Sequence, residues 1–326
     1  MSVQKLNKES ITSAPKIIQT TQHCDSVITL PHNLGPVPEL LSKRYRIERL
    51  LGVGGMGAVY RARDLLREQF GDPEPWIALK TLNDSFAEYP DANALLYSEF
   101  ALTSGLHHSH VIQVHDFHVD SIYQRAYVTM ELLKGPTLDQ LISSHPDGMP
   151  WSQFQEIATA LLQALTYAHR RGVMHGDLKP SNVIMAVDGL RLFDFGLGQA
   201  TGGKLPGLPR LDRVRIAAWT PRYAALELLE GKPLSCAADV YAVACVLYEL
   251  SSGHHPFSRM TARQAKHMEQ DKSLARPPLL PQHCWPALRQ ALAFDEEKRI
   301  DAQRLLNAFS APPPTLLQRL ISRRTK

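Results

Sequence analysis

The sequence predicts an α+β fold in two lobes: a small antiparallel sheet with one helix, followed by a larger, mainly helical part. Two observations support this prediction. From Tyr45 to about Lys80, apolar residues alternate with polar ones and glycines interrupt the pattern, as in paired strands. Beyond Gly135 the apolar residues recur at helical spacing. We therefore place the border between the lobes at Gly135.

The first lobe, residues 45–134, should contain further elements after its first strands. A helix is expected over residues 92–106, and strands over residues 111–114 and 127–132. Residues 66–75 include one glycine and two prolines, so we predict a loop there.

The second lobe, residues 135–309, contains two clear helical patterns. Residues 151–171 carry an apolar stripe at helical spacing, formed by Phe154, Ile157, Ala158, Leu161, Leu162, Leu165 and Ala168. Residues 237–252 are apolar on nearly every side, which predicts a buried helix.

Composition excludes several classes of protein. The 326 residues are 44% hydrophobic with a formal net charge of +4, so disorder is excluded as the main state. The most apolar stretch, residues 240–248, is far shorter than the roughly 20 residues of a spanning helix. No signal pattern opens the chain, and the four cysteines lack metal-ligand spacing. We expect a cytoplasmic protein without a transmembrane span.

The two ends differ from the rest in composition. Residues 1–44 are rich in hydroxyl side chains without sustained periodicity, and we interpret them as a flexible extension. Residues 310–326 form a short basic tail with helical apolar spacing. A surface helix packed on the second lobe is the first interpretation of this tail, and weak contact with an anionic membrane or a partner is the second.

A glycine-rich run follows the first predicted strand. Glycines allow a tight turn and let backbone N–H groups approach phosphate oxygens. Alone this is a weak signal, because a turn without a ligand has the same spacing, and a dinucleotide-binding turn would need a helix where a strand continues. The run consists of Leu51, Gly52, Val53, Gly54, Gly55, Met56, Gly57, Ala58 and Val59.

Two further motifs carry charged side chains. Lys80 ends a predicted strand, and Glu99 follows 19 residues later on the next predicted helix, where it could hold the lysine near phosphates. Asp177 and Asn182 lie in the run His-Gly-Asp-Leu-Lys-Pro-Ser-Asn, and Asp194 opens Asp-Phe-Gly twelve residues after Asn182. Phosphoryl transfer needs oxygen ligands for Mg²⁺ and a carboxylate to accept the hydroxyl proton.

Together these motifs resemble the Hanks-type serine/threonine protein kinases, most of all their bacterial branch, over residues 45–309. The resemblance implies a bilobal protein-kinase-like fold and transfer of the γ-phosphoryl of ATP to Ser/Thr hydroxyls of proteins, with autophosphorylation. It implies ATP and Mg²⁺ as cofactors, with Mn²⁺ as an alternative ion. Protein substrates are the expected partners, a cognate phosphatase is a candidate partner, and no nucleic acid is expected.

The resemblance also implies roles for single residues. Asp177 would be the catalytic base and Lys179 the contact to the γ-phosphate. Lys80 would contact the α/β-phosphates and pair with Glu99. The metal ligands would be Asn182 and Asp194; the adenine would lie between Val59, Ala78 and Ile184; and the backbone of Glu131 and Leu133 would bind the adenine edge.

Positions further along the chain match structural features of the same family. Residues 220–227 resemble its substrate-facing loop, in which Glu227 would pair with Arg299, and Asp239 resembles its structural helix acid. Gly176 stands where the family usually has an arginine, and Thr201 is the only hydroxyl side chain between Gly196 and Thr220. We therefore expect this loop to work without phosphothreonine pairing.

Two other functions remain open from the sequence. The His-Gly-Asp run also resembles small-molecule phosphotransferases of the aminoglycoside and choline kinase type, which usually lack Asp-Phe-Gly and the lysine two residues after the base. A nucleotide-binding pseudokinase scaffold normally shows a lost base, lysine or metal ligand. Here all four residues are present, Lys80, Asp177, Asn182 and Asp194, which favours the protein kinase.

Overall fold

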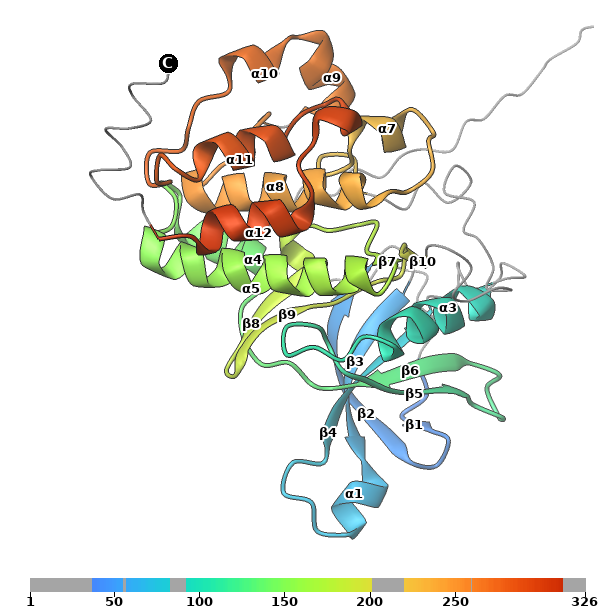
Figure 1. The fold of residues 1–326 in the computed structure, drawn as a ribbon. Coiled ribbons are helices and arrows are strands. Elements are labelled where there is room, and N and C mark those ends of the chain that lie inside the picture. The colour runs from blue at the N-terminus through green and yellow to red at the C-terminus, as the bar shows by residue number, and fades with distance from the viewer. Residues whose placement is uncertain (1–36, 55–56, 83–91, 201–219, 259, 313–326) are drawn as a thin grey trace, which may run out of the picture.

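A six-stranded antiparallel sheet forms the first lobe in the computed structural model, which describes residues 37–54, 57–82, 92–200, 220–258 and 260–312 (Figure 1). The strand order is β1-β2-β3-β4-β6-β5, and every neighbouring pair is antiparallel. The strands are β1 (Leu40–Leu41), β2 (Tyr45–Val53), β3 (Gly57–Asp64), β4 (Trp76–Leu82), β5 (Val114–Val119) and β6 (Ala126–Met130).

Helix α3 (Ala92–Ser104) covers one face of this sheet. Its buried Leu95 and Leu96 share an apolar cluster with Ala78 of β4 and Val128 of β6. The helix expected over residues 92–106 is therefore confirmed, and so is the strand expected near residues 127–132.

Two local expectations for this lobe are wrong. The strand expected over residues 111–114 instead begins at Val114, because Val111 forms an isolated bridge to Leu192 of the second lobe. Residues 66–75, expected to form a loop throughout, begin within a helix that was not predicted, α1 (Leu65–Gln69). Asp64 caps this helix by accepting hydrogen bonds from the backbone N–H groups of Leu66 and Arg67.

The ordered lobe also begins before residue 45. Leu41, expected in the flexible extension, is fully buried in a cluster with Tyr45 and Tyr127. The turn that follows β1 is tied down, since the N–H of Ser42 donates to Asp120 (2.5 Å) and the hydroxyl of Tyr127 donates to Ser42 Oγ (2.8 Å). Burial and hydrogen bonding hold this segment although it is too short to show periodicity in sequence.

The second lobe is built around the buried helix α8 (Cys236–Ser252), which lies against α5 (Trp151–Arg170). Both helices were predicted, and both are confirmed. Helix α12 (Ala302–Ser310) packs on α5. A hydrogen bond from Gln155 Nε2 of α5 to the carbonyl of Phe309 (2.9 Å) links the two helices. The other helices are α4 (Leu138–Ser144), α7 (Leu226–Leu229), α9 (Ala262–His267), α10 (Gln270–Ser273), α11 (Trp285–Ala291) and the short turns η1 (Pro180–Asn182) and η2 (Glu296–Lys298).

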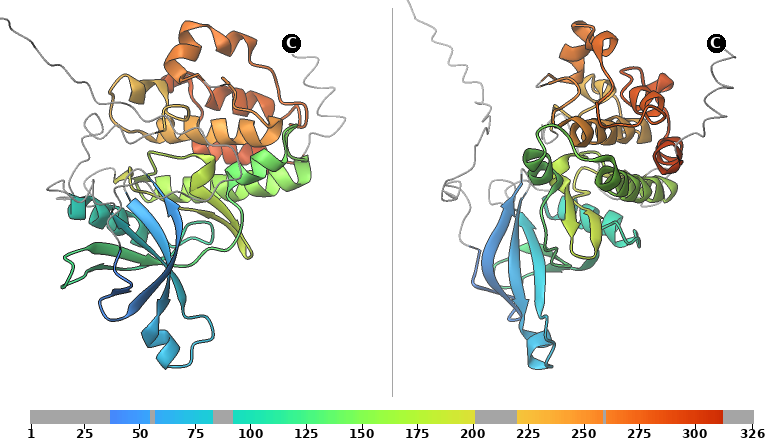
Figure 2. Two further views of the ribbon diagram at one scale, coloured as in Figure 1. Left: turned by 180° about the vertical axis from the view of Figure 1, so that it is seen from behind. Right: turned by 90° about the vertical axis from the view of Figure 1, so that its left-hand side faces the viewer.

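Four short strands line the side of this lobe that meets the sheet. They form two antiparallel pairs, β8 (Val183–Ala186) with β9 (Gly189–Leu192) and β7 (Val173–Met174) with β10 (Gln199–Ala200). Two further views show the sheet, with α1 and α3 beside it, at one end of the molecule and the helices of the second lobe at the other (Figure 2). The bilobal α+β fold predicted from the sequence is confirmed.

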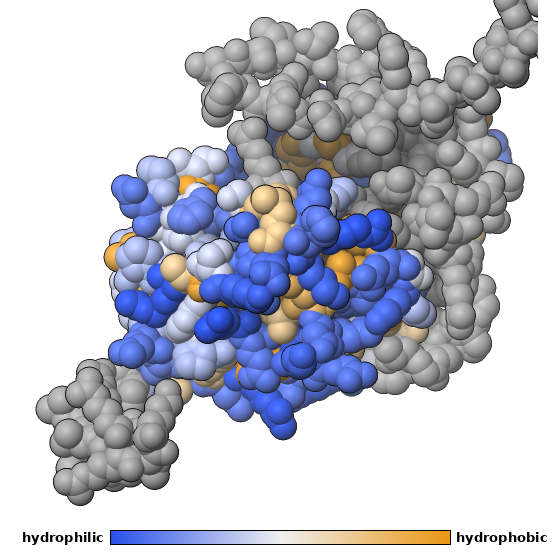
Figure 3. All heavy atoms as spheres, turned by 90° about the horizontal axis from the view of Figure 1, so that it is seen from above, coloured by the Kyte–Doolittle hydropathy of each residue, from blue (hydrophilic) through white to orange (hydrophobic). Residues whose placement is uncertain are grey.

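The outer surface of the helical lobe is mostly polar. Seen from that end, the described surface is largely hydrophilic with small apolar spots (Figure 3). Among the helices that the structure describes, none combines the length and the hydropathy needed to span a bilayer. Thr201, residues 1–36 and the tail beyond residue 312 lie outside the described residues.

Candidate active site

A buried histidine holds the segment that contains Asp177 in place. His175 follows strand β7 and is fully buried. Its Nε2 lies 3.0 Å from the carbonyl oxygen of Phe193, and its Nδ1 accepts a hydrogen bond from the N–H of Asp177 (3.2 Å). The imidazole therefore links the segment before Asp177 to the segment before Asp194.

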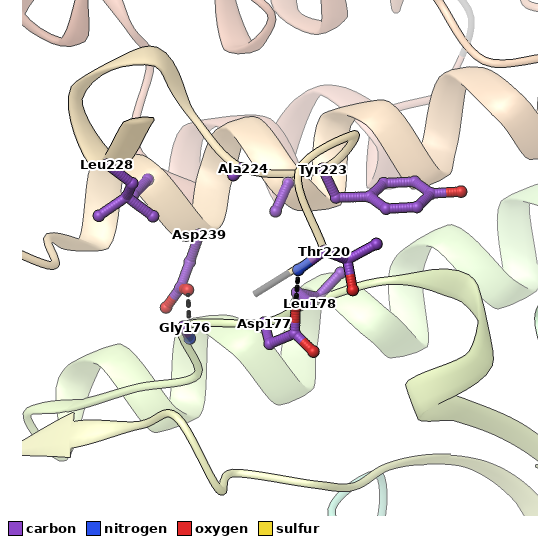
Figure 4. A pocket seen from close by; sticks show the side chains of 10 residues that line it. Gly176, Asp177, Leu178, Thr220, Tyr223, Ala224, Leu228 and Asp239 are labelled. Atoms are coloured by element: carbon purple, nitrogen blue, oxygen red, sulfur yellow. Dashed lines mark hydrogen bonds between the residues drawn. The ribbon is translucent and has the colours of Figure 1, made fainter. Parts of the chain in front are cut away.

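Asp239 of helix α8 holds the backbone of the same segment. Its carboxylate accepts hydrogen bonds from the N–H groups of His175 (2.8 Å) and Gly176 (2.9 Å), as Figure 4 shows for Gly176, and from His169 Nε2 (2.9 Å). Burial alone would raise the pKa of Asp239, but His169 and these hydrogen bonds lower it. Gly176 has φ +82°, a conformation that glycine adopts without strain.

The carboxylate of Asp177 is held by two donors. Lys179 Nζ lies 2.5 Å from Oδ2, and the N–H of Thr220 donates to Oδ1 (3.0 Å), as drawn in Figure 4. Lys179 also donates to the hydroxyl of Thr220 (3.0 Å). The side chain of Asp177 is only 9% exposed. Asp177, Lys179 and Thr220 thus form one constellation, in which both carboxylate oxygens of Asp177 accept hydrogen bonds.

The loop that contains Thr220 packs directly on this segment. A small cavity of about 10 Å³, roughly the space of one water molecule, separates Gly176 and Leu178 from Tyr223 and Leu228 (Figure 4). Sequence reasoning placed Thr220 in an expected substrate-facing loop but did not identify it as a hydrogen-bond partner of Asp177.

A lysine of the first lobe lies between two carboxylates. Lys80 Nζ is 2.6 Å and 2.8 Å from the two carboxylate oxygens of Glu99 and 2.7 Å from Asp194 Oδ1. The expected pairing of Lys80 with Glu99 is present. Burial alone would lower the pKa of Lys80, but the two carboxylates raise it, so the ammonium is charged.

Of the two predicted metal ligands, Asp194 lies beside this lysine, and Asn182 is joined to the residue before Asp194, because the N–H of Phe193 donates to the Asn182 carbonyl (3.0 Å). Asn182 Nδ2 donates to the carbonyl of Asp177 (2.9 Å), which leaves its Oδ1 without a hydrogen-bond donor among the described residues. Asp194 Oδ2 also lacks a donor there, and Asp194 has φ +67°. Burial alone would raise the pKa of Asp194, but Lys80 lowers it. An amide oxygen and an ionised carboxylate fit a hard divalent cation such as Mg²⁺.

The glycine-rich run forms the hairpin between β2 and β3. The N–H of Gly54 donates to the carbonyl of Gly57 (2.7 Å), and a Cβ at Gly57 would overlap the carbonyl of Thr81 on β4. Glycine is therefore required at Gly57 for close approach of two strands. Leu51, Gly52 and Val53 lie at the exposed end of β2, Ala58 is buried in β3, and Gly55 and Met56 lie outside the described residues.

Most residues expected around the adenine lie together. Val59 and Leu133 pack on the apolar cluster that contains Ala78 and Met130, and Val59 is the cross-strand partner of Lys80. Ile184 lies in β8 of the second lobe, partly buried and outside this cluster.

The side chain of Glu131 is anchored by Gln113 and Arg191. It accepts a hydrogen bond from the N–H of Gln113 (2.8 Å) and lies 3.4 Å from Arg191. Its own N–H donates to the carbonyl of Gln113 (2.9 Å). The Glu131 N–H is therefore already used, and only the Glu131 carbonyl remains for a hydrogen bond to an adenine edge. Sequence reasoning could not predict which of the two backbone groups is used within the protein.

A buried ion pair closes the loop at residues 220–227. Arg299 donates to both carboxylate oxygens of Glu227, at 2.6 Å and 3.1 Å, and the two side chains are 0% and 2% exposed. The pairing expected from the sequence is confirmed.

Curated proteins are similar to this chain in sequence over two thirds or more of its length. The chain is 30% identical over 281 residues to the serine/threonine-protein kinase PkaA of Streptomyces coelicolor, covering 81% of this chain and 49% of that protein. It is 31% identical over 224 residues to the serine/threonine-protein kinase PknB of Mycobacterium leprae, covering 68% of this chain and 34% of that protein. The chain spans about half or less of the length of these curated relatives. A family model described as the protein kinase domain matches residues 45–309, the span from strand β2 to helix α12 that holds every site residue described above, and the chain belongs to this family.

Proposed function

We propose that the chain is a protein serine/threonine kinase that transfers the γ-phosphoryl of ATP to Ser or Thr hydroxyls of proteins, including its own. The observation that carries the proposal is the constellation at Asp177, whose carboxylate is oriented by Lys179 and by the backbone of Thr220. A carboxylate in this position can accept the proton of a hydroxyl group.

The remaining site residues would position the nucleotide. Bound ATP would supply the phosphoryl group that is transferred, and its divalent cation would neutralise part of the negative charge of the phosphates. Lys80 would bind phosphate oxygens, and its contacts with Glu99 and Asp194 already hold the ammonium in place. Asn182 and Asp194 would hold the cation, for which we propose Mg²⁺ with Mn²⁺ as an alternative.

Substrate binding would follow from the position of the base. An acceptor hydroxyl must come within hydrogen-bond distance of Asp177. Lys179, also bound to Thr220, would then lie beside both the hydroxyl and the phosphoryl group, where its charge favours the transition state.

The proposal is tested with labelled ATP and Mg²⁺ on the wild-type protein, Lys80→Met and Asp177→Asn. We expect label in a generic protein substrate, and a loss of about 10²- to 10⁴-fold in Asp177→Asn, the range that a general base contributes. Lys80→Met should lose transfer because it removes the ammonium proposed to bind the phosphate oxygens. Lys272→Met and Asp271→Asn are matched controls on the exposed helix α10 and should keep wild-type activity.

The alternatives give different results in the same assay. Aminoglycosides and choline are offered beside the protein substrate. Label in these small molecules alone would establish a small-molecule phosphotransferase instead. Bound nucleotide without transfer to any acceptor would establish a scaffold.

A further inference from the structure

The residues after Thr220 lie next to the place where an acceptor must bind. Thr220 contacts both Asp177 and Lys179. Consecutive Cα atoms are 3.8 Å apart, so the Cα of Arg222 lies within about 7.6 Å of the Cα of Thr220. Neighbours of a hydroxyl bound at Asp177 are therefore within reach of the Arg222 side chain.

Arg222 has more donors than the described residues use. Its side chain is 42% exposed, and its shortest distance to a carboxylate, from a terminal guanidinium nitrogen to Glu249 Oε1, is 3.7 Å. Its Nε–H is buried and has no acceptor among the described residues. A guanidinium presents five N–H donors in a planar fork that matches a carboxylate. The guanidinium carbon also lies 5.8 Å from the centroid of the Tyr223 ring, a contact that uses no N–H donor in a hydrogen bond. Together with the long distance to Glu249, this leaves most of the fork without an acceptor among the described residues.

Glu249 is a weak counter-ion for Arg222 because it is already engaged. Its other carboxylate oxygen accepts a hydrogen bond from the hydroxyl of Tyr223 (2.6 Å), and its side chain is 11% exposed. Burial raises the pKa of Glu249 although Tyr223 and Arg222 oppose this shift. His255 contacts the ring of Tyr223. Burial together with Arg222 lowers the pKa of His255 to about 4, so His255 adds no positive charge at neutral pH.

We propose that Arg222 selects protein substrates that carry a carboxylate side chain, Asp or Glu, within two residues of the acceptor hydroxyl. This inference rests on the proposed function and names the substrate class of the same site. The carboxylate would occupy the free side of the guanidinium fork and complete its hydrogen bonds. Arg222 acts here as a specificity-determining residue, because it touches a neighbour of the acceptor and not the reacting atoms.

The test uses synthetic peptides with one Ser acceptor, in which each of the four neighbouring positions is Glu, Gln or Lys in turn. At one position we expect the wild-type protein to show a KM about fivefold lower for Glu than for Lys, the upper range for a partly exposed ion pair, with kcat less affected. Arg222→Ala should remove this preference, Arg222→Lys should keep part of it, and Arg222→Glu should reverse it in favour of Lys. Arg289→Glu makes the same charge change on exposed helix α11 and should behave as wild type.

A merely structural role for Arg222 would lower activity with all peptides alike and could not reverse the preference. Equal KM values for Glu and Lys at all four positions in the wild type would overturn the inference, and so would a Glu preference that survives in Arg222→Glu.

A binding measurement separates this inference from the proposed function. Fluorescence anisotropy with peptides that carry Ala in place of the acceptor Ser reports selection without transfer. Preferential binding of the Glu peptide that Arg222→Glu reverses supports the inference even if no phosphoryl transfer occurs, a result that would contradict only the proposed function. Transfer to peptides without any charge preference in binding or KM would contradict only the inference.

Discussion

The ion pair between Arg299 and Glu227 is the most deeply buried charge pair that the described residues contain. Arg299 also donates to the carbonyls of Ala237 (2.7 Å) and Ala293 (3.0 Å), so a single side chain joins the end of the loop at residues 220–227 to helix α8 and to the segment after α11. Removing one partner leaves a buried charge without compensation, which costs far more than the pair itself contributes.

We expect Arg299→Met to lower the free energy of unfolding by about 3–5 kcal/mol, measured by urea denaturation. The double variant Glu227→Gln with Arg299→Met should lose less than Arg299→Met alone, because no unpaired charge remains. Lys272→Met breaks an exposed pair with Glu269 and should cost less than about 1 kcal/mol. A double variant as unstable as the single one would show that the neutral hydrogen bonds of Arg299, and not its charge, matter most.

Single residues of the site differ in how far sequence can predict them. The pair Lys80 and Glu99 follows from a lysine on a predicted strand and a glutamate on the next predicted helix, and the structure places their side chains in contact, with Lys80 inside β4 and not at its end. Thr220 meets Asp177 only because the chain returns 43 residues later, so no local pattern marks that contact. The orientation of Glu131 depends on Arg191 of β9, a contact that sequence spacing does not indicate.

Elements with long apolar periodicity were predicted best. Helices α5 and α8 are long and bury many side chains, so their patterns are strong. Helix α1 buries none of its residues and depends on its cap Asp64, a signal that a search for apolar spacing overlooks although Asp64 is a preferred capping residue. Strand β1 is two residues long and is held by tertiary burial of Leu41, which local sequence does not encode.

The contact between α5 and α8 makes stability depend on pH. Burial alone would lower the pKa of His169, but its hydrogen bond to Asp239 and the nearby Cys236 raise it to about 9. A histidine whose pKa is raised in the folded state contributes its full stability below its unfolded value of about 6.5. This contribution is lost as pH rises through about 9.

We therefore expect the free energy of unfolding to fall between about pH 6.5 and pH 9, by about 3 kcal/mol relative to His169→Gln. The measurement is urea denaturation at several pH values, in which His169→Gln should show the flatter profile. His267→Gln on the exposed surface of α9 is the control and should follow the wild type. Parallel profiles for wild type and His169→Gln would contradict the raised pKa.

At the scale of the whole molecule, the two lobes meet through a few specific contacts. Residues after α3 pair with β9, since the N–H of Leu192 donates to the carbonyl of His110 (2.9 Å) and the N–H of Ile112 donates to the carbonyl of Leu192 (3.0 Å). Lys80 of the first lobe reaches Asp194 of the second at 2.7 Å. Residues proposed to bind ATP therefore belong to both lobes, so a bound nucleotide would stabilise their juxtaposition as well as either lobe.

Saturating ATP with Mg²⁺ should therefore raise the melting temperature of the whole protein. At a ligand concentration of 100 Kd the stabilisation is about 2.7 kcal/mol, which corresponds to roughly 5 °C for a domain that spans residues 45–309. In Asp194→Asn, ATP with Mg²⁺ should raise the melting temperature only as much as ATP with EDTA raises that of the wild type. The reason is that the variant lacks the ionised carboxylate proposed to bind the cation. Asp271→Asn on exposed α10 is the matched control and should show the full shift. If wild type and Asp194→Asn gained the same shift with Mg²⁺, the cation would not be held by Asp194, and the shared site between the lobes would have to bind the nucleotide without it.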